Sequence, residues 1–254
     1  MDVLFLEAPY SGEVKLCPAT LNYLQKKKYN TVAVYASVQF CNNLGHVHQQ
    51  LHDAKIAVIT SQADRTHVKS QLLGCDNYHA SLNLSEKELK DIDAYLYVGD
   101  GKFHPLALAY GQKEAKIKKE VVCNDPLSNS CTILSQKEIE KVLKKYKGSL
   151  LKFLSAHNVG VLVTIKPGQE QLKPSYFLKK KFPQKKFYYF IDNIISFDQL
   201  ENFNFIDVWV NSACPRIGLD DQQQFRRGVL NLNDALHAEE ILSADHLWTK
   251  WDFF

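Results

Sequence analysis

Cys214 stands in a sequence setting that could serve metal chemistry. It lies in the segment WVNSACPRIGLDD, where an apolar stretch gives way to Pro215 and Arg216. The preceding cysteine in the chain is Cys131, so a local zinc site built from neighbouring thiols is excluded. Cys214 is therefore either a small, partly buried side chain or a metal ligand.

The same two interpretations apply to the other cysteines. No two of them have the C-x-x-C spacing of zinc knuckles or thioredoxin-type motifs, and disulfides are not expected in a reducing compartment. Burial as a small apolar side chain is the expectation for most of them. The six cysteines are Cys17, Cys41, Cys75, Cys123, Cys131 and Cys214.

Two turns carry polar residues that could contact a ligand. The turn Gly99-Asp100-Gly101 allows the backbone to approach a ligand closely, and His104 follows it. Lys166 and Gln169 flank a Pro-Gly turn, where a lysine could meet a carboxylate and a glutamine could hydrogen-bond one. Taken singly, each feature is also typical of an ordinary strand-to-helix turn or polar loop.

The elements that must position these residues alternate between strands and helices. Apolar segments of strand length are expected to form strands at 3–7, 31–38, 55–60, 94–98, 159–165, 187–191 and 207–210. Helices are expected at 17–28, 43–54, 85–92, 103–110, 135–146, 150–157 and 174–181. Segments 121–124 and 131–134 are expected to pair across a turn. The pattern predicts an α/β fold with parallel sheets covered on both faces.

Two consecutive α/β domains are expected, residues 1–140 with the GDGKFH turn and residues 141–254 with the SACPR turn. Ligands of open α/β sheets bind beyond the carboxyl ends of the strands. Candidate side chains follow four of the predicted strands: Gln39 with Cys41, residues 99–104, residues 166–169, and Cys214 with Arg216. We therefore expect these strand ends to form one site.

The bulk composition is that of a soluble globular protein. The chain has 254 residues, of which 45% are hydrophobic and 23% charged. Its apolar segments are too short to span a membrane, and its first residues lack a signal-peptide pattern, so a cytoplasmic location is expected. The net charge of +3 does not indicate nucleic acid. The lysine clusters at 26–28 and 179–186 are expected to be solvated, with docking of an acidic partner or RNA as the alternative.

Several segments together resemble the diphthamide synthase family. They are, in order, QLLGC, YLYVGDGKFHPLALA, NDPLSNSCTIL, VLVTIKPGQ, DVWVNSACPRIGLDD and GVLNLNDALHAE. The resemblance extends over residues 1–254, and its most specific parts are GDGxFH and ACPR. It implies three related α/β domains, each giving one cysteine to a [4Fe-4S] cluster. It also implies that S-adenosylmethionine donates a 3-amino-3-carboxypropyl group, through a radical, to a histidine of elongation factor 2.

The resemblance implies specific roles for the candidate residues. Cys75 and Cys214 match the cluster ligands of the family's middle and last domains. Arg216, Lys166 and Gln169 match positions near the cluster, where they would hold the methionine carboxylate. The cofactor pocket is expected to include Gly99, Asp100, Gly101, His104 and Gln39.

The family's first domain, with its own cluster cysteine, is not expected within this sequence. Four explanations are open for the third ligand. A separate polypeptide could supply it in a heteromer; a cysteine of this chain could replace it, with Cys41 preferred to Cys17; the chain could be a non-catalytic partner subunit; or the sequence could be truncated. Archaeal members of the family form homodimers, so a homodimer is the alternative assembly.

Transfer of the 3-amino-3-carboxypropyl group is the expected function. The competing hypothesis is an accessory subunit that binds the acceptor protein or supports a catalytic paralogue. A third hypothesis is an α/β protein of this family that binds an unrelated nucleotide without a cluster.

Overall fold

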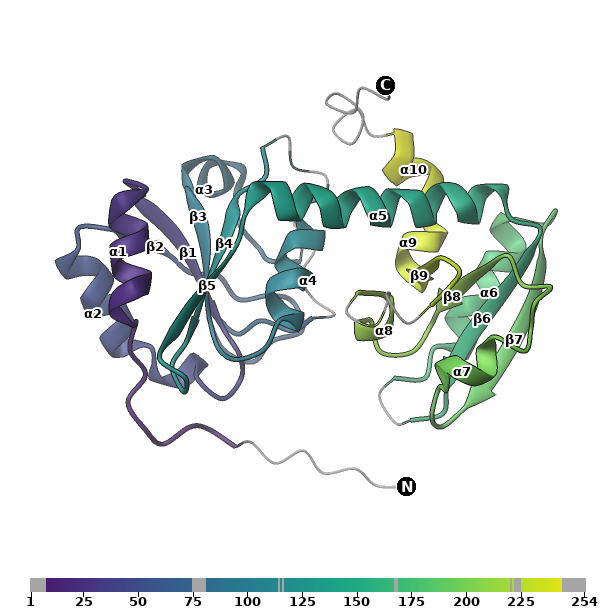
Figure 1. Ribbon diagram of the computed structural model, residues 1–254, viewed down its shortest axis with the longest axis horizontal. Helices are drawn as coiled ribbons and strands as arrows, with labels where there is room; N and C mark the ends of the chain where they lie inside the picture. The colour runs from purple at the N-terminus through teal and green to yellow at the C-terminus, as the bar shows by residue number, and fades with distance from the viewer. Residues whose placement is uncertain are drawn as a thin grey trace. The chain divides into compact units, whose positions relative to one another are not determined.

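The chain folds into two compact units, Met1–Val142 and Leu143–Phe254, each built around one β-sheet. The computed structural model describes residues 8–74, 81–113, 115, 117–166, 169–219, 221 and 225–243 (Figure 1). Parallel strand pairs predominate in both sheets, which confirms the predicted α/β class. The predicted strand at 3–7 lies outside the described residues. No helix within the described ranges is long and apolar enough to cross a membrane.

The first unit contains a five-stranded sheet with the order β2-β1-β3-β4-β5. Its strands are β1 (Thr31–Ala36), β2 (Ala57–Ile59), β3 (Ala94–Val98), β4 (Glu120–Asp125) and β5 (Ser130–Leu134). The pairs β1–β2, β1–β3 and β3–β4 are parallel. β5 returns antiparallel to β4 across a short turn, as the sequence predicted. The carboxyl ends of β1 and β3 therefore lie side by side.

Helices cover both faces of this sheet (Figure 1). They are α1 (Pro18–Lys26), η1 (Cys41–Asn43), α2 (Gly45–Asp53), α3 (Glu86–Asp91) and α4 (Phe103–Gly111). Leu24 of α1 and Leu51 of α2 pack with alternate residues of β1 and β3, such as Val34 and Leu96, in one hydrophobic core. Every residue of β3 is buried, as expected for a central strand with both faces covered.

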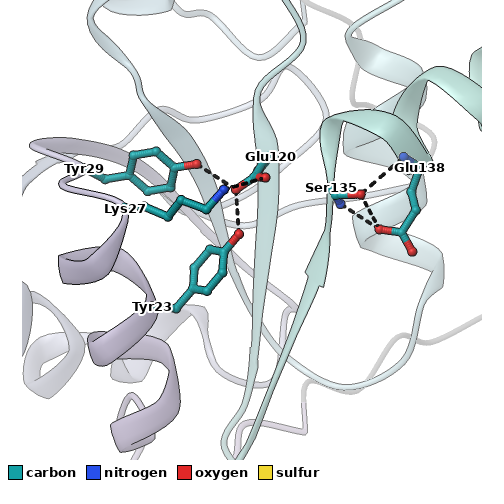
Figure 2. A network of polar contacts seen from close by, with 6 residues as sticks. All are labelled: Tyr23, Lys27, Tyr29, Glu120, Ser135 and Glu138. Carbon is teal, nitrogen blue, oxygen red and sulfur yellow. Dashed lines mark hydrogen bonds and ion pairs between the residues drawn. The ribbon is translucent and has the colours of Figure 1, made fainter.

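A polar cluster fixes α1 to β4 at the strand's amino end (Figure 2). The carboxylate of Glu120 accepts hydrogen bonds from Tyr23 at 2.8 Å, from Tyr29 at 2.7 Å and from Lys27 at 3.2 Å. Burial by itself would raise the pKa of Glu120, but these three donors outweigh it and hold the pKa below its usual value. The cluster lies at the opposite end of β4 from the predicted site, so we assign it a structural role.

Capping boxes start two helices as their Ser-x-x-Glu spacing predicted. Ser85 and Glu88 exchange side-chain and backbone hydrogen bonds at the start of α3. Ser135 and Glu138 make the same contacts at the start of α5 (Gln136–Ser155), as Figure 2 shows.

The second unit contains a four-stranded sheet with the order β7-β6-β8-β9, in which every pair is parallel. Its strands are β6 (Asn158–Thr164), β7 (Lys186–Asp192), β8 (Val208–Asn211) and β9 (Val229–Asn231). Its helices are α6 (Leu172–Lys181), α7 (Phe197–Leu200), α8 (Arg216–Leu219), α9 (Leu232–Leu236) and α10 (Ala238–Ser243). Trp209 packs on one sheet face against Leu162 and Phe190.

The two helices predicted at 135–146 and 150–157 are one helix, α5, of 20 residues. Gly148 lies between the two predicted helices and does not interrupt α5. A glycine inside a helix costs only about 1 kcal/mol relative to alanine. Leu143, Leu150 and Phe153 are buried on both sides of Gly148 at helical spacing, and their burial outweighs this cost.

Candidate functional site

The first cluster of predicted site residues lies at the carboxyl ends of β1 and β3. Gln39 and Cys41 follow β1, and the Gly99–Gly101 turn follows β3. The backbone N–H of Ser37 donates to the carbonyl oxygen of Val98 at 3.2 Å and joins the two loops. Gln39 and Asp100 are exposed, so their side chains are accessible at this edge.

The glycine turn is shaped by contact with Tyr97 and by its backbone conformation. A Cβ atom at Gly99 would lie 2.5 Å from the Tyr97 hydroxyl oxygen, so only glycine fits beside the phenol. Gly101 has φ of 71°, in the left-handed region that other L-residues disfavour. Both glycines are therefore required by the structure, for different reasons.

His104 is held by the same tyrosine. The Tyr97 hydroxyl lies 3.0 Å from Nδ1 of His104, and the two rings stack with centroids 5.5 Å apart. Burial, with a smaller contribution from the nearby Asp100 charge, raises the pKa of Tyr97, so the phenol remains protonated. The phenol can therefore donate its proton to Nδ1 of His104.

Cys75 itself lies outside the described residues, but the segment that leads to it is part of this edge. Gln71 forms an isolated parallel bridge with Ala36, the last residue of β1. Gly74 lies against Phe103 of the GDGKFH motif, at the start of α4. The residue immediately before Cys75 is therefore next to the helix that follows the glycine turn.

Cys41 occupies the same edge but is largely buried. Its residue is 9% exposed, and its thiol donates to the carbonyl oxygen of Val38 at 3.2 Å. To bind a metal, Cys41 would have to give up this local hydrogen bond. Its position fits the predicted site, while its role as a replacement ligand stays a prediction.

In the second unit, Cys214 lies in the loop between β8 and α8. The residue is partly exposed. Ser212 anchors the start of this loop to the neighbouring strand β6, because its backbone N–H and its hydroxyl both donate to the carbonyl oxygen of Leu162, at 2.9 and 2.8 Å. The thiol is thus presented at the carboxyl edge of the sheet, where α/β proteins bind ligands.

Two asparagines that sequence reasoning missed hold the rest of this loop. Asn211 donates through Nδ2 to the carbonyl oxygen of Cys214 at 2.9 Å and to Oδ1 of Asn231 at 2.7 Å. Asn231 in turn donates to the carbonyl oxygen of Pro215 at 3.2 Å. The motif GVLNLNDALHAE entered only as part of the resemblance. An asparagine at the end of its apolar segment, Asn231, was the one sequence feature that could have indicated this contact.

Lys166, Gln169 and Arg216 are exposed at the ends of the adjacent strands β6 and β8. The backbone N–H of Gln169 donates to the carbonyl oxygen of Lys166 at 3.1 Å, which closes the turn between them. Pro167 and Gly168 lie outside the described residues. The structure thus places Lys166 and Gln169 on the loop that follows β6, and Arg216 at the start of α8, directly after the Cys214 loop that follows β8.

The remaining described cysteines are suited to structural roles. Cys17 and Cys123 are buried, and Cys131 is half-buried. Burial raises the pKa of Cys123 to about 12, so its thiol is protonated at neutral pH. Within the residues that the structure describes, no three His, Cys, Asp or Glu side chains are grouped so that they could hold a metal ion.

Comparisons with known proteins give a consistent result. The family model described as "Putative diphthamide synthesis protein" matches residues 1–248. The 2-(3-amino-3-carboxypropyl)histidine synthase of Methanocaldococcus jannaschii is 35% identical over 147 residues, which are 56% of this chain and 41% of that protein. The enzyme of the same name from Pyrococcus horikoshii is 29% identical over 210 residues, 81% of this chain and 56% of that protein.

The fold matches a solved structure as well. The crystal structure of Dph2 from Pyrococcus horikoshii with a 4Fe-4S cluster superposes with a TM-score of 0.67 and 25% identity. The match covers 92% of this chain and 64% of that chain. The chain thus spans about half the length of the curated relatives it matches.

Proposed function

Because the chain belongs to the diphthamide synthesis family, we propose that it takes part in the first step of diphthamide formation. In this step a 3-amino-3-carboxypropyl group passes from S-adenosylmethionine to a histidine of elongation factor 2. The bond between sulfur and the γ-carbon of the methionine moiety breaks, and a carbon–carbon bond replaces a C–H bond of the imidazole. Methylthioadenosine leaves and the imidazole carbon loses its proton. The names of the relatives and the 4Fe-4S cluster in the similar Dph2 structure support the proposal.

The observation that carries the proposal is the arrangement of Cys214, Arg216 and Lys166. Cys214 lies in the loop between β8 and α8, Arg216 starts α8, and Lys166 lies in the loop that follows β6. The strands β6 and β8 are hydrogen-bonded neighbours in one parallel sheet. A thiol and two cations are thereby presented at one sheet edge. Arg216 and Lys166 suit a carboxylate, and Gln169 adds an amide donor on the same loop as Lys166.

Cys214 fits a [4Fe-4S] cluster by its chemistry and position. A ligand thiol must be reachable from outside the fold, and Cys214 is partly exposed at an open edge. In this proposal Cys75 is a second ligand, and Cys41 or a cysteine of another polypeptide is the third. A cluster held by these thiolates would supply one electron for cleavage of S-adenosylmethionine and would take it back as the product forms.

The first unit is proposed to contribute the cofactor contacts. The narrow glycine turn at 99–101 lets backbone amides approach the cofactor, while His104 and Gln39 offer polar groups from the same edge. The two units correspond, in this proposal, to the middle and last domains of the family. For the assembly, we propose either a heteromer with a polypeptide that supplies the third cluster ligand or a homodimer.

The test is an anaerobic assay with S-adenosylmethionine and elongation factor 2, in which methylthioadenosine and the modified histidine peptide are measured by mass spectrometry. The proposal predicts both products, in the presence of the partner polypeptide if it is required. Arg216→Met should reduce the yield more than Lys173→Met, which removes an exposed lysine of α6. Cluster binding without either product under all these conditions would favour an accessory role.

A further inference from the structure

We infer that Asn211 and Asn231, here called the amide pair, are positioning residues that fix the loop carrying Cys214. The value of this loop for cluster binding rests on the proposed function, whereas the geometry of the pair does not. Asn211 is the last residue of β8 and Asn231 the last residue of β9, and the two are direct partners in the parallel register. Their side chains therefore meet at the strand ends from which the Cys214 loop starts.

Both amides are buried, with exposed fractions of 1% for Asn211 and 8% for Asn231. A buried amide needs hydrogen-bond partners, because desolvating it without them is unfavourable. An apolar side chain would fill such a position at a lower cost in desolvation free energy. Two amides are therefore expected here only if their hydrogen bonds are needed. Within the described part of the chain, the hydrogen-bond partners of both amides belong to the pair itself or to the Cys214 loop.

The amide pair holds three consecutive residues of the loop. Oδ1 of Asn211 accepts from the backbone N–H of Ala213 at 3.1 Å, and its two Nδ2 hydrogens serve Cys214 and Asn231. Asn231 donates to the carbonyl oxygen of Pro215. Each amide is locked in one orientation, because turning it over would set its N–H groups against donors. The backbone on both sides of the Cys214 Cα is thereby fixed before any ligand binds.

The next helix is shaped to leave room for the pair. A Cβ at Gly218 of α8 would lie 2.4 Å from Oδ1 of Asn231 and 2.7 Å from its side-chain carbon. The same helix begins with the N–H of Ile217 donating to the carbonyl oxygen of Cys214 at 3.0 Å. Gly218→Ala therefore offers a way to displace the Asn231 amide while both asparagines are kept.

The test measures the reactivity of the Cys214 thiol in the full, metal-free, reduced chain. Iodoacetamide labelling is followed over time, and the Cys214 peptide is quantified by mass spectrometry. Asn231→Asp keeps the shape and the acceptor oxygen but removes the donor to Pro215. This variant and Gly218→Ala are each expected to label several-fold faster than the wild type, because the loop opens more often.

Asp207→Asn is the matched control. Asp207 accepts hydrogen bonds from the backbone N–H groups of His157 and Asn158, just before the amino end of β8. Its substitution disturbs the same strand to a similar degree but should leave the Cys214 labelling rate unchanged. Wild-type rates in both Asn231→Asp and Gly218→Ala would overturn the inference, as would an equal increase in Asp207→Asn.

The outcome is independent of the proposed function. Labelling is measured without metal, so a chain that never binds iron can still confirm or overturn the role of the amide pair. Conversely, retention of iron in Cys214→Ala would show that Cys214 is not a cluster ligand. The labelling result would remain valid. After reconstitution with iron and sulfide, Asn231→Asp is expected to lose its iron to a chelator faster than Asp207→Asn.

Discussion

Gly74 packs so closely against Phe103 that a Cβ atom at Gly74 would lie 2.1 Å from two carbon atoms of the ring. This contact joins the segment that leads to Cys75 with the helix that follows the glycine turn. The QLLGC and GDGKFH motifs are thus parts of one local arrangement. The glycine before the cysteine is explained by the need to pass over an aromatic ring.

Gly74→Ala is therefore expected to destabilise the protein. The Phe103 ring must move, and overpacking of this kind costs about 1–3 kcal/mol in the free energy of unfolding. Urea denaturation measures the loss. Gly45→Ala is the control, because a Cβ at Gly45 in α2 meets no atom within 4 Å. Equal stability of the two variants would show that the Gly74–Phe103 contact is not tight.

The two glycines of the 99–101 turn should respond differently to alanine. A Cβ atom at Gly101 would meet no atom within 4 Å, but alanine would have to adopt the left-handed φ of 71°. Gly101→Ala is therefore expected to lower the free energy of unfolding by about 1–2 kcal/mol. Gly99→Ala pushes the Tyr97 phenol away from His104. Tyr97→Phe removes the hydroxyl that contacts His104 and should therefore destabilise the wild type. In the Gly99→Ala background this contact is already lost, so Tyr97→Phe should have little further effect. Additive free energies of unfolding in this double-mutant cycle would refute the proposed displacement.

The Glu120 cluster should contribute stability that depends on pH. Because the pKa of Glu120 is lowered in the folded state, its contribution is present above the unfolded-state pKa, near 4.5, and is lost as pH falls through the folded-state pKa. Glu120→Gln is expected to cost about 1–3 kcal/mol at pH 7. The difference from the wild type should shrink below pH 4.5 in urea titrations. Glu140→Gln, on the exposed face of α5, should show neither effect.

Lys185 should stabilise the end of α5 rather than serve the site. Its ammonium group donates to the carbonyl oxygens of Leu154 and Ala156, both at 2.7 Å, and lies over the ring of Phe153. Lys185→Met leaves these carbonyls without their donor and should cost about 1–3 kcal/mol in thermal or urea unfolding. Lys186→Met, one residue further and exposed, should be nearly neutral. Similar losses in both variants would argue against this capping role.

The fold class could be predicted from the sequence because central strands of both sheets are nearly continuous apolar segments. Val159–Thr164 of β6 and all of β3 are buried, so their composition carries a strong signal. β9 was missed because three residues carry little periodicity. The single helix α5 was missed because local propensity at Gly148 was outweighed by the burial of side chains on either side of it.

The place of a candidate residue in the fold could be predicted only where the residue directly follows a strand in the sequence. Gln39 and Gly99 follow strands of the first sheet and Cys214 follows a strand of the second, so each could be assigned to the carboxyl ends of its own sheet. The link between Asn211 and Asn231, and that between Gly74 and Phe103, depend on contacts between distant segments. Neither contact could be predicted, because the residue pattern of one segment does not show which distant segment it packs against.

The central claim is that Cys214 is a ligand of an iron–sulfur cluster, and bound iron and sulfide measure it most directly. The wild-type chain, Cys214→Ala and Cys123→Ala are to be reconstituted anaerobically and analysed side by side. Cys123 is the control, because its buried thiol has a pKa raised to about 12 and is not expected to bind metal. We predict iron and sulfide in the wild type and in Cys123→Ala, and their loss in Cys214→Ala. Unchanged iron and sulfide in Cys214→Ala would contradict the claim.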